Sequence, residues 1–151
     1  ALFMMAAMLY ERTKTYDISS LGGIAAVAPR FSILFTLFAL SIVGVPMTAG
    51  FVAEVLIVLG AFHYNIYIGF MTATTLLIAM LFMFKMISQV LYGKTSKATE
   101  NFEDLRMHEL MALIPLSFLV LAMGIFPNYF RQKIDPTDLY YTVEKEVSYH
   151  E

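Results

Sequence analysis

Apolar residues dominate four stretches of the chain, and polar and charged residues gather between them. The apolar stretches are residues 1–10, 31–62, 68–92 and 110–127. A helix needs about 20 apolar residues to cross a bilayer, and the last three stretches are near or beyond that length. The pattern therefore predicts an all-α fold, a polytopic transmembrane helix bundle. We expect residues 1–127 to form the membrane domain and 128–151 a polar C-terminal tail.

The stretch 31–62 is too long for one straight span. As a continuous helix its 32 residues would extend about 48 Å, against a hydrocarbon core of about 30 Å. Pro46 removes a helical hydrogen bond, and the glycines on either side of it lower the helix propensity. We therefore predict one discontinuous (broken) helix, whose link is buried in protein or lines a polar cavity. The link residues are Gly44, Pro46, Thr48 and Gly50.

The two ends of the chain carry separate expectations. Residues 1–10 are apolar but lack an initiating Met, a basic segment and a cleavage site, so we interpret them as a partial helix, the end of a transmembrane span. The chain is then expected to be a C-terminal piece of a longer membrane protein. In the tail, residues 135–138 predict either the N-cap of a short amphipathic segment or a disordered region.

Basic residues predict the orientation of the chain. The segments 11–30 and 93–109 each carry three Lys or Arg residues, and the connection at 63–67 carries none. Because basic loops remain on the cytoplasmic side, we expect both segments in the cytoplasm and the C-terminal tail in the periplasm.

Composition excludes several classes of function. The chain is 59% hydrophobic and only 15% charged, with a mean hydropathy of +0.70, which is typical of a protein in a lipid bilayer. The pI of 5.9 and the lack of a basic cluster argue against nucleic-acid binding. There is no Cys, and His63, His108 and His150 form no ligand-spaced pair. No metal, cofactor or catalytic residue is therefore expected within this chain.

Glu54 is the charged residue that the pattern singles out. It follows the predicted link and is the one Asp, Glu, Lys or Arg between Phe31 and Phe84. An ionisable group at membrane depth costs about 2.5–3.5 kcal/mol on insertion scales, so it suggests function. The nearby helix N-terminus favours the ionised carboxylate and desolvation disfavours it, a balance that suits a proton relay. Alternatively, Glu54 pairs with a basic residue of a neighbouring helix and specifies packing.

Lys85 is the next charge, and Gln89 lies one helical turn beyond it. The two side chains share a helix face and are candidates for a polar path to the cytoplasm. Lys85 is also about 10 Å from the end of its span at Tyr92, so it is equally an interfacial anchor that extends toward the headgroups.

Several of these residues resemble a known family. Four segments carry the resemblance: Leu9-Tyr10-Glu11-Arg12-Thr13-Lys14-Thr15, Leu21-Gly22-Gly23, Val43-Gly44-Val45-Pro46-Met47-Thr48-Ala49-Gly50-Phe51-Val52-Ala53-Glu54 and Leu91-Tyr92-Gly93. Their order and spacing resemble the C-terminal third of the antiporter-like subunit M family of bacterial NADH-quinone oxidoreductase, respiratory complex I. The family has equivalents in mitochondria, as chain 4, and in chloroplasts and cyanobacteria. The resemblance covers residues 1 to about 127.

The resemblance implies that Glu54 is the terminal proton-transfer carboxylate toward the outer face. Subunit L and the multisubunit sodium/proton antiporters tend to carry Lys at that position, so Glu favours subunit M. The family's upstream relay residues are absent from this sequence. The family also commonly has a basic residue where this chain has Ser88-Gln89, and Lys85 is our candidate to replace it.

The resemblance also implies a setting. The chain is expected in the bacterial inner membrane, within the lipid bilayer and beside antiporter-like subunits L and N. It is a non-redox subunit of a translocase that couples quinone reduction to proton pumping. The NADH, FMN, iron–sulfur clusters and quinone of the parent complex are expected to bind elsewhere. The alternatives are a subunit of a multisubunit sodium/proton antiporter or membrane-bound hydrogenase, and a structural membrane subunit.

Overall fold

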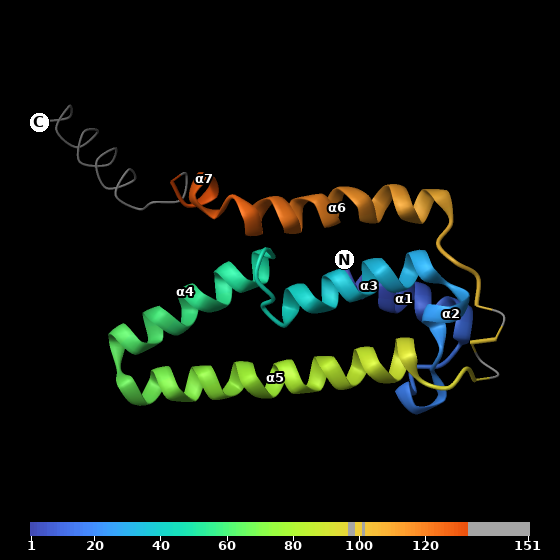
Figure 1. Ribbon diagram of the computed structural model, residues 1–151, viewed down its shortest axis with the longest axis horizontal. Coiled ribbons are helices and arrows are strands. Elements are labelled where there is room, and N and C mark those ends of the chain that lie inside the picture. The colour runs from blue at the N-terminus through green and yellow to red at the C-terminus, as the bar shows by residue number, and fades with distance from the viewer. Residues whose placement is uncertain (97–98, 101, 133–151) are drawn as a thin grey trace, which may run out of the picture.

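The computed structural model describes residues 1–96, 99–100 and 102–132, with side chains up to residue 129. In these residues the chain is helical and contains no strand (Figure 1), which confirms the predicted all-α class. The elements are α1 (Leu2–Thr13), η1 (Ile18–Ser20), α2 (Ile24–Val27), α3 (Pro29–Ile42), α4 (Ala49–Tyr64), α5 (Ile66–Tyr92), α6 (Met107–Ile125) and α7 (Pro127–Gln132).

The long helices form a layered bundle. Helices α3 and α4 follow one another in the same direction, and α5 returns antiparallel along both of them (Figure 1). Helix α6 lies on the opposite side of α3 and α4, and α1 packs against α3. By length and hydropathy, α5 and α6 are long and apolar enough to cross a membrane, whereas α3 and α4 have 14 and 16 residues.

The buried core lies at one end of the bundle, around α3. Its largest fully buried side chains include Phe31, Met5, Ile24, Leu91 and Leu113. By contrast, α4 contributes no buried residue, and most of the apolar surface of α5 and α6 is exposed. An apolar surface of this kind is suited to lipid or to further helices rather than to water.

Helix α5 and helix α6 each begin before the apolar stretch that predicts them. The Asn65 side chain accepts a hydrogen bond from the Tyr67 backbone N–H (2.8 Å), which caps the start of α5. The Glu109 carboxylate accepts one from the Arg106 N–H (2.8 Å), which caps α6. A polar side chain at the start of each helix, Asn65 at the N-cap of α5 and Glu109 in the first turn of α6, thus satisfies a free backbone donor.

A six-residue link, residues 43–48, separates α3 from α4. The Val45 N–H donates to the Leu40 carbonyl (3.1 Å) and the Gly44 N–H to the Ser41 carbonyl (3.3 Å). With Gly44 at a φ of 72°, this pair of bonds is a Schellman motif, which closes α3 and satisfies its last carbonyls. Whether α3 and α4 act together as one discontinuous span stays a prediction.

The polar segments fold against each other at the end of the bundle that holds the core. Residues 11–30 contain η1 and α2 and are therefore more ordered than a simple polar loop. The Gly22 backbone lies against Lys94, where a Cβ would overlap the Lys94 carbonyl. The buried Thr99 hydroxyl donates to the Gly22 carbonyl (2.6 Å). The predicted tail begins with α7, and its proposed amphipathic segment at 135–147 lies outside the described residues.

Candidate functional site

Glu54 extends from the second turn of α4 back to the link. Its carboxylate lies against the Cα of Gly44, where an added Cβ would overlap the Glu54 Oε2 atom. The left-handed φ of Gly44 is easily adopted by glycine. Gly44 therefore serves two purposes: it closes α3, and it leaves room for the carboxylate.

The surroundings of Glu54 are apolar. The side chain is partly buried and lines an open pocket of about 260 Å³ between α4, α5 and the link. The other lining residues are Gly44, Phe51, Val55, Val58, Leu59 and Leu76. Within the described part of the chain, no ion pair or hydrogen bond to the Glu54 carboxylate occurs. These residues therefore supply Glu54 with no cation.

The other predicted link residues differ in their surroundings. Thr48 is buried, and its hydroxyl donates to the Val45 carbonyl (2.7 Å). Gly50 lies directly against the Ser41 carbonyl of α3, so the two helices touch where α4 begins. Pro46 is exposed. Thr48 thus stabilises the link and already has an acceptor for its hydroxyl proton.

Lys85 and Gln89 lie on α5 and are both exposed. Leu76, which lines the Glu54 pocket, precedes Lys85 by nine residues, or about 13 Å along the helix. The fold therefore places Lys85 and Gln89 on the helix that supplies Leu76 to the Glu54 pocket, but further toward the end with the polar loops. Among the described residues, no group of three potential metal ligands is present.

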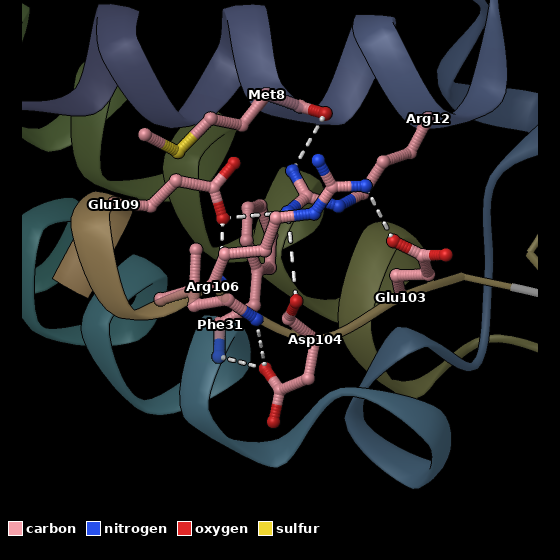
Figure 2. A network of polar contacts seen from close by, with 8 residues as sticks. Met8, Arg12, Phe31, Glu103, Asp104, Arg106 and Glu109 are labelled. Atoms are coloured by element: carbon pink, nitrogen blue, oxygen red, sulfur yellow. Dashed lines mark hydrogen bonds and ion pairs between the residues drawn. The ribbon is translucent and has the colours of Figure 1, made fainter.

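A second charged cluster, which the sequence pattern did not single out, ties α1 to α6 (Figure 2). Arg12 Nη2 lies 2.6 Å from Glu109 Oε2, and both side chains are only about 10% exposed (11% and 10%). The Arg12 guanidinium also donates to the Met8 carbonyl (3.3 Å) and lies 5.5 Å from the centre of the Phe102 ring. Arg12 belongs to one of the segments that resemble the known family, but the pattern of polar and apolar residues does not indicate that Glu109 is its partner.

Arg106 forms an exposed ion pair with Glu103 beside this cluster. The Arg106 Nη2 lies 2.8 Å from Glu103 Oε2, with exposed fractions of 64% and 67%. The hydrogen bond from Arg106 lowers the pKa of the Glu103 carboxyl, and the same bond raises the pKa of Arg106. Any stability from this pair is present above the ordinary pKa of glutamate and is lost as the pH falls through the lowered value. Solvent screens the pair strongly.

Asp104 caps α3 from a distant segment. Its Oδ1 accepts from the Phe31 N–H (3.0 Å) and its Oδ2 from the Arg30 N–H (3.2 Å). These are free donors of the first helical turn, and a carboxylate there is also favoured by the helix dipole. Asp104 therefore holds the start of α3, the helix that ends at the Glu54 site.

Asp104→Ala is expected to lower the free energy of unfolding by about 0.5–2 kcal/mol, the usual cost of losing a cap. The measurement is denaturant unfolding of the protein in detergent. Asp17→Ala is the matched control, since Asp17 caps only the exposed three-residue η1. Equal losses of unfolding free energy in the two variants would show that a cap from a distant segment stabilises the protein no more than the local cap of η1 does.

Comparisons with known proteins agree with the resemblance in the sequence. The family described as NADH:quinone oxidoreductase/Mrp antiporter, TM, matches residues 1–79. NADH-quinone oxidoreductase subunit M of Rickettsia bellii is 34% identical over 84% of this chain and 26% of that protein. NADH-ubiquinone oxidoreductase chain 4 of Chondrus crispus is 31% identical over 89% of this chain and 27% of that protein.

The fold agrees as well. A chain of respiratory complex I from Thermus thermophilus with bound NADH superposes with a TM-score of 0.79 at 28% sequence identity. The match covers 89% of this chain and 28% of that chain, so the present chain spans about a quarter of the length of its relatives. It belongs to the NADH:quinone oxidoreductase/Mrp antiporter transmembrane family, as its motifs predicted.

Proposed function

We propose that this chain is part of a proton-translocating membrane subunit of NADH-quinone oxidoreductase, with Glu54 as its terminal relay carboxylate. The relatives named subunit M and chain 4 support the assignment to the complex. Quinone reduction elsewhere in the complex drives the transfer, and this subunit holds no redox centre or catalytic site of its own. NADH, FMN, iron–sulfur clusters and quinone bind to other subunits.

The position of the Glu54 carboxylate against Gly44 carries the proposal. The carboxylate lies between the C-terminal end of α3, which carries partial negative charge, and the first turn of α4, which carries partial positive charge. The first field favours the protonated acid and the second the ionised form. Because the surroundings are otherwise apolar, a change in a nearby charge acts on Glu54 with little screening. That sensitivity is what an electrostatically driven relay requires.

The remaining assignments follow from the same proposal. Lys85 and Gln89 form the inward part of the path, on the α5 face that is exposed in this chain. The polar segments 11–30 and 93–109 lie in the cytoplasm, and the tail lies in the periplasm. Antiporter-like subunits L and N are the neighbours in the membrane.

A sodium/proton antiporter subunit is the second candidate, because the matching family also includes the Mrp antiporters. Proton movement would then depend on a sodium gradient and would need no NADH. Vesicles containing the purified parent complex separate the two: NADH with quinone drives acidification in the first case, and a sodium gradient alone drives it in the second.

Glu54→Gln is expected to assemble normally and to lower the number of protons pumped per electron. Glutamine keeps the size of the side chain but cannot release a proton at neutral pH. The measurement is NADH-driven proton pumping by the whole complex reconstituted in vesicles, together with the amount of assembled complex. Glu100→Gln, at an exposed residue of the polar loop, is the matched control and should pump normally.

Two results would contradict the relay role. Glu54→Gln complex that pumps at the normal proton-to-electron ratio removes Glu54 from the path. Poor assembly combined with normal pumping by the surviving complex assigns Glu54 to helix packing instead.

A further inference from the structure

Three glycines from different segments lie at the link, Gly50 and Gly124 against backbone atoms and Gly44 against the Glu54 carboxylate. Gly44 lies in the link, Gly50 in the first turn of α4, and Gly124 near the end of α6. A Cβ at Gly124 would overlap the backbone of Met47 and Thr48. Helix α6 therefore lies directly on the link, with no side chain between the two backbones.

The part of the link under Gly124 has an unusual conformation. Met47 has a φ of 76°, which residues with a Cβ rarely adopt. Such a conformation persists only where the surroundings hold it in place. The surroundings here are the α6 backbone at Gly124 on one side and the Thr48 N–H to Val45 carbonyl bond (3.2 Å) within the link.

Met47, which α6 holds in place, is close in the chain to Gly44, against which the Glu54 carboxylate lies. Gly44 is three residues before Met47, and the Val45 N–H between them is bonded to the Leu40 carbonyl of α3 (3.1 Å). A displacement of Met47 by α6 must therefore be absorbed within a few bonded residues. The Cα of Gly44, which faces the carboxylate, lies within this short segment.

We propose that Gly124 and Gly44 are positioning residues for Glu54: Gly124 lets α6 fix the link, and Gly44 gives the carboxylate its place against the link. The proposal rests on the proposed function, since it concerns the same proton-transfer residue. Helix α6 supplies no titratable group to the Glu54 pocket. In this proposal it nevertheless controls where the relay carboxylate lies. Proton transfer requires hydrogen-bond reach between donor and acceptor, so this position determines the rate.

The test is Gly124→Ala in the whole complex, with two readouts. The first is the infrared band of the Glu54 carboxyl group, identified as the band that Glu54→Gln removes. The second is the rate of NADH-driven proton pumping. The added methyl group pushes the link away from α6, so we expect the band to shift. Pumping should slow about 10- to 100-fold, because a misplacement of about 1 Å costs a reacting group up to that much.

Gly60→Ala is the matched control, because Gly60 lies in α4 and has open space around it; it should leave both readouts unchanged. If Gly124→Ala does not assemble, Gly44→Ala decides, since its methyl group displaces the carboxylate directly. An assembled variant with an unchanged band and unchanged pumping overturns the proposal, even where Glu54→Gln abolishes pumping. A shifted band in Gly124→Ala supports the positioning role of Gly124. If Glu54→Gln nevertheless pumps normally, that second result contradicts only the relay role of Glu54.

Discussion

Glu109→Leu is expected to lower the free energy of unfolding by about 3–5 kcal/mol, the cost of leaving one member of a buried ion pair unpaired. Arg12 is almost completely covered in the folded chain and lies 2.6 Å from the Glu109 carboxylate. Without that carboxylate, the remaining hydrogen bonds of the guanidinium are to the Met8 and Asp104 carbonyls, and it lies beside the Phe102 ring. The variant also loses the cap on the Arg106 N–H at the start of α6. Denaturant unfolding in detergent measures the loss.

A double variant distinguishes the cost of leaving Arg12 unpaired from the loss of contact between the two side chains. Arg12→Met combined with Glu109→Leu should recover most of the lost stability, because an apolar pair of similar volume carries no desolvation penalty. Glu103→Leu is the control for the same chemistry at an exposed site, and its unfolding midpoint should barely move. A Glu109→Leu variant as stable as Glu103→Leu would show that Arg12 finds another partner or reaches water.

Gly50→Ala is expected to produce the second large loss, about 1–3 kcal/mol of unfolding free energy. The added methyl group has no room, because a Cβ at this position overlaps the Ser41 carbonyl. That carbonyl also accepts the Gly44 N–H in the motif that closes α3. The variant must therefore separate the helices or break the closing hydrogen bond. The measurement is again denaturant unfolding in detergent.

Gly60→Ala makes the identical chemical change ten residues later in the same helix. It meets no atom within 4 Å and should be neutral or stabilising by up to about 1 kcal/mol, since alanine has the higher helix propensity. Because the two variants make the same Gly-to-Ala change within one helix, the difference between their unfolding free energies reports the contact with the Ser41 carbonyl rather than helix propensity. If both variants behave alike, contact with Ser41 has no energetic weight.

The local pattern predicted the interruption near Glu54 well. Glycine and proline act on the residues beside them, so Gly44, Pro46 and Gly50 indicated where one helix ends and the next begins: α3 ends at Ile42 and α4 begins at Ala49. The role of Gly44 in seating the carboxylate was not predictable. It depends on the φ of that residue and on the direction of a side chain ten positions later, which no pattern along the chain specifies.

The charged cluster around Arg12, by contrast, could not be predicted from the sequence pattern. Arg12, Asp104 and Glu109 lie in segments that composition alone describes as polar loops, and charges in such loops are usually solvated. The contacts that these residues make depend on α1, α3 and α6 meeting at one end of the bundle. Gly124 was missed for a similar reason, because a glycine in an apolar stretch has no visible partner until the fold places the link against it. The inward role of Lys85 and Gln89 stays a prediction.

The contact between Arg12 and Glu109 joins two residues that are synthesised at different times. The two residues are 97 positions apart, and a ribosome adds about 5–20 residues per second. Helix α1 therefore waits on the order of 5–20 seconds for the carboxylate that covers its arginine. During that interval the guanidinium lacks its native carboxylate and has only the Met8 carbonyl of its own helix as a native acceptor. The contact between α1 and α6 is thus a late event in the synthesis of these segments.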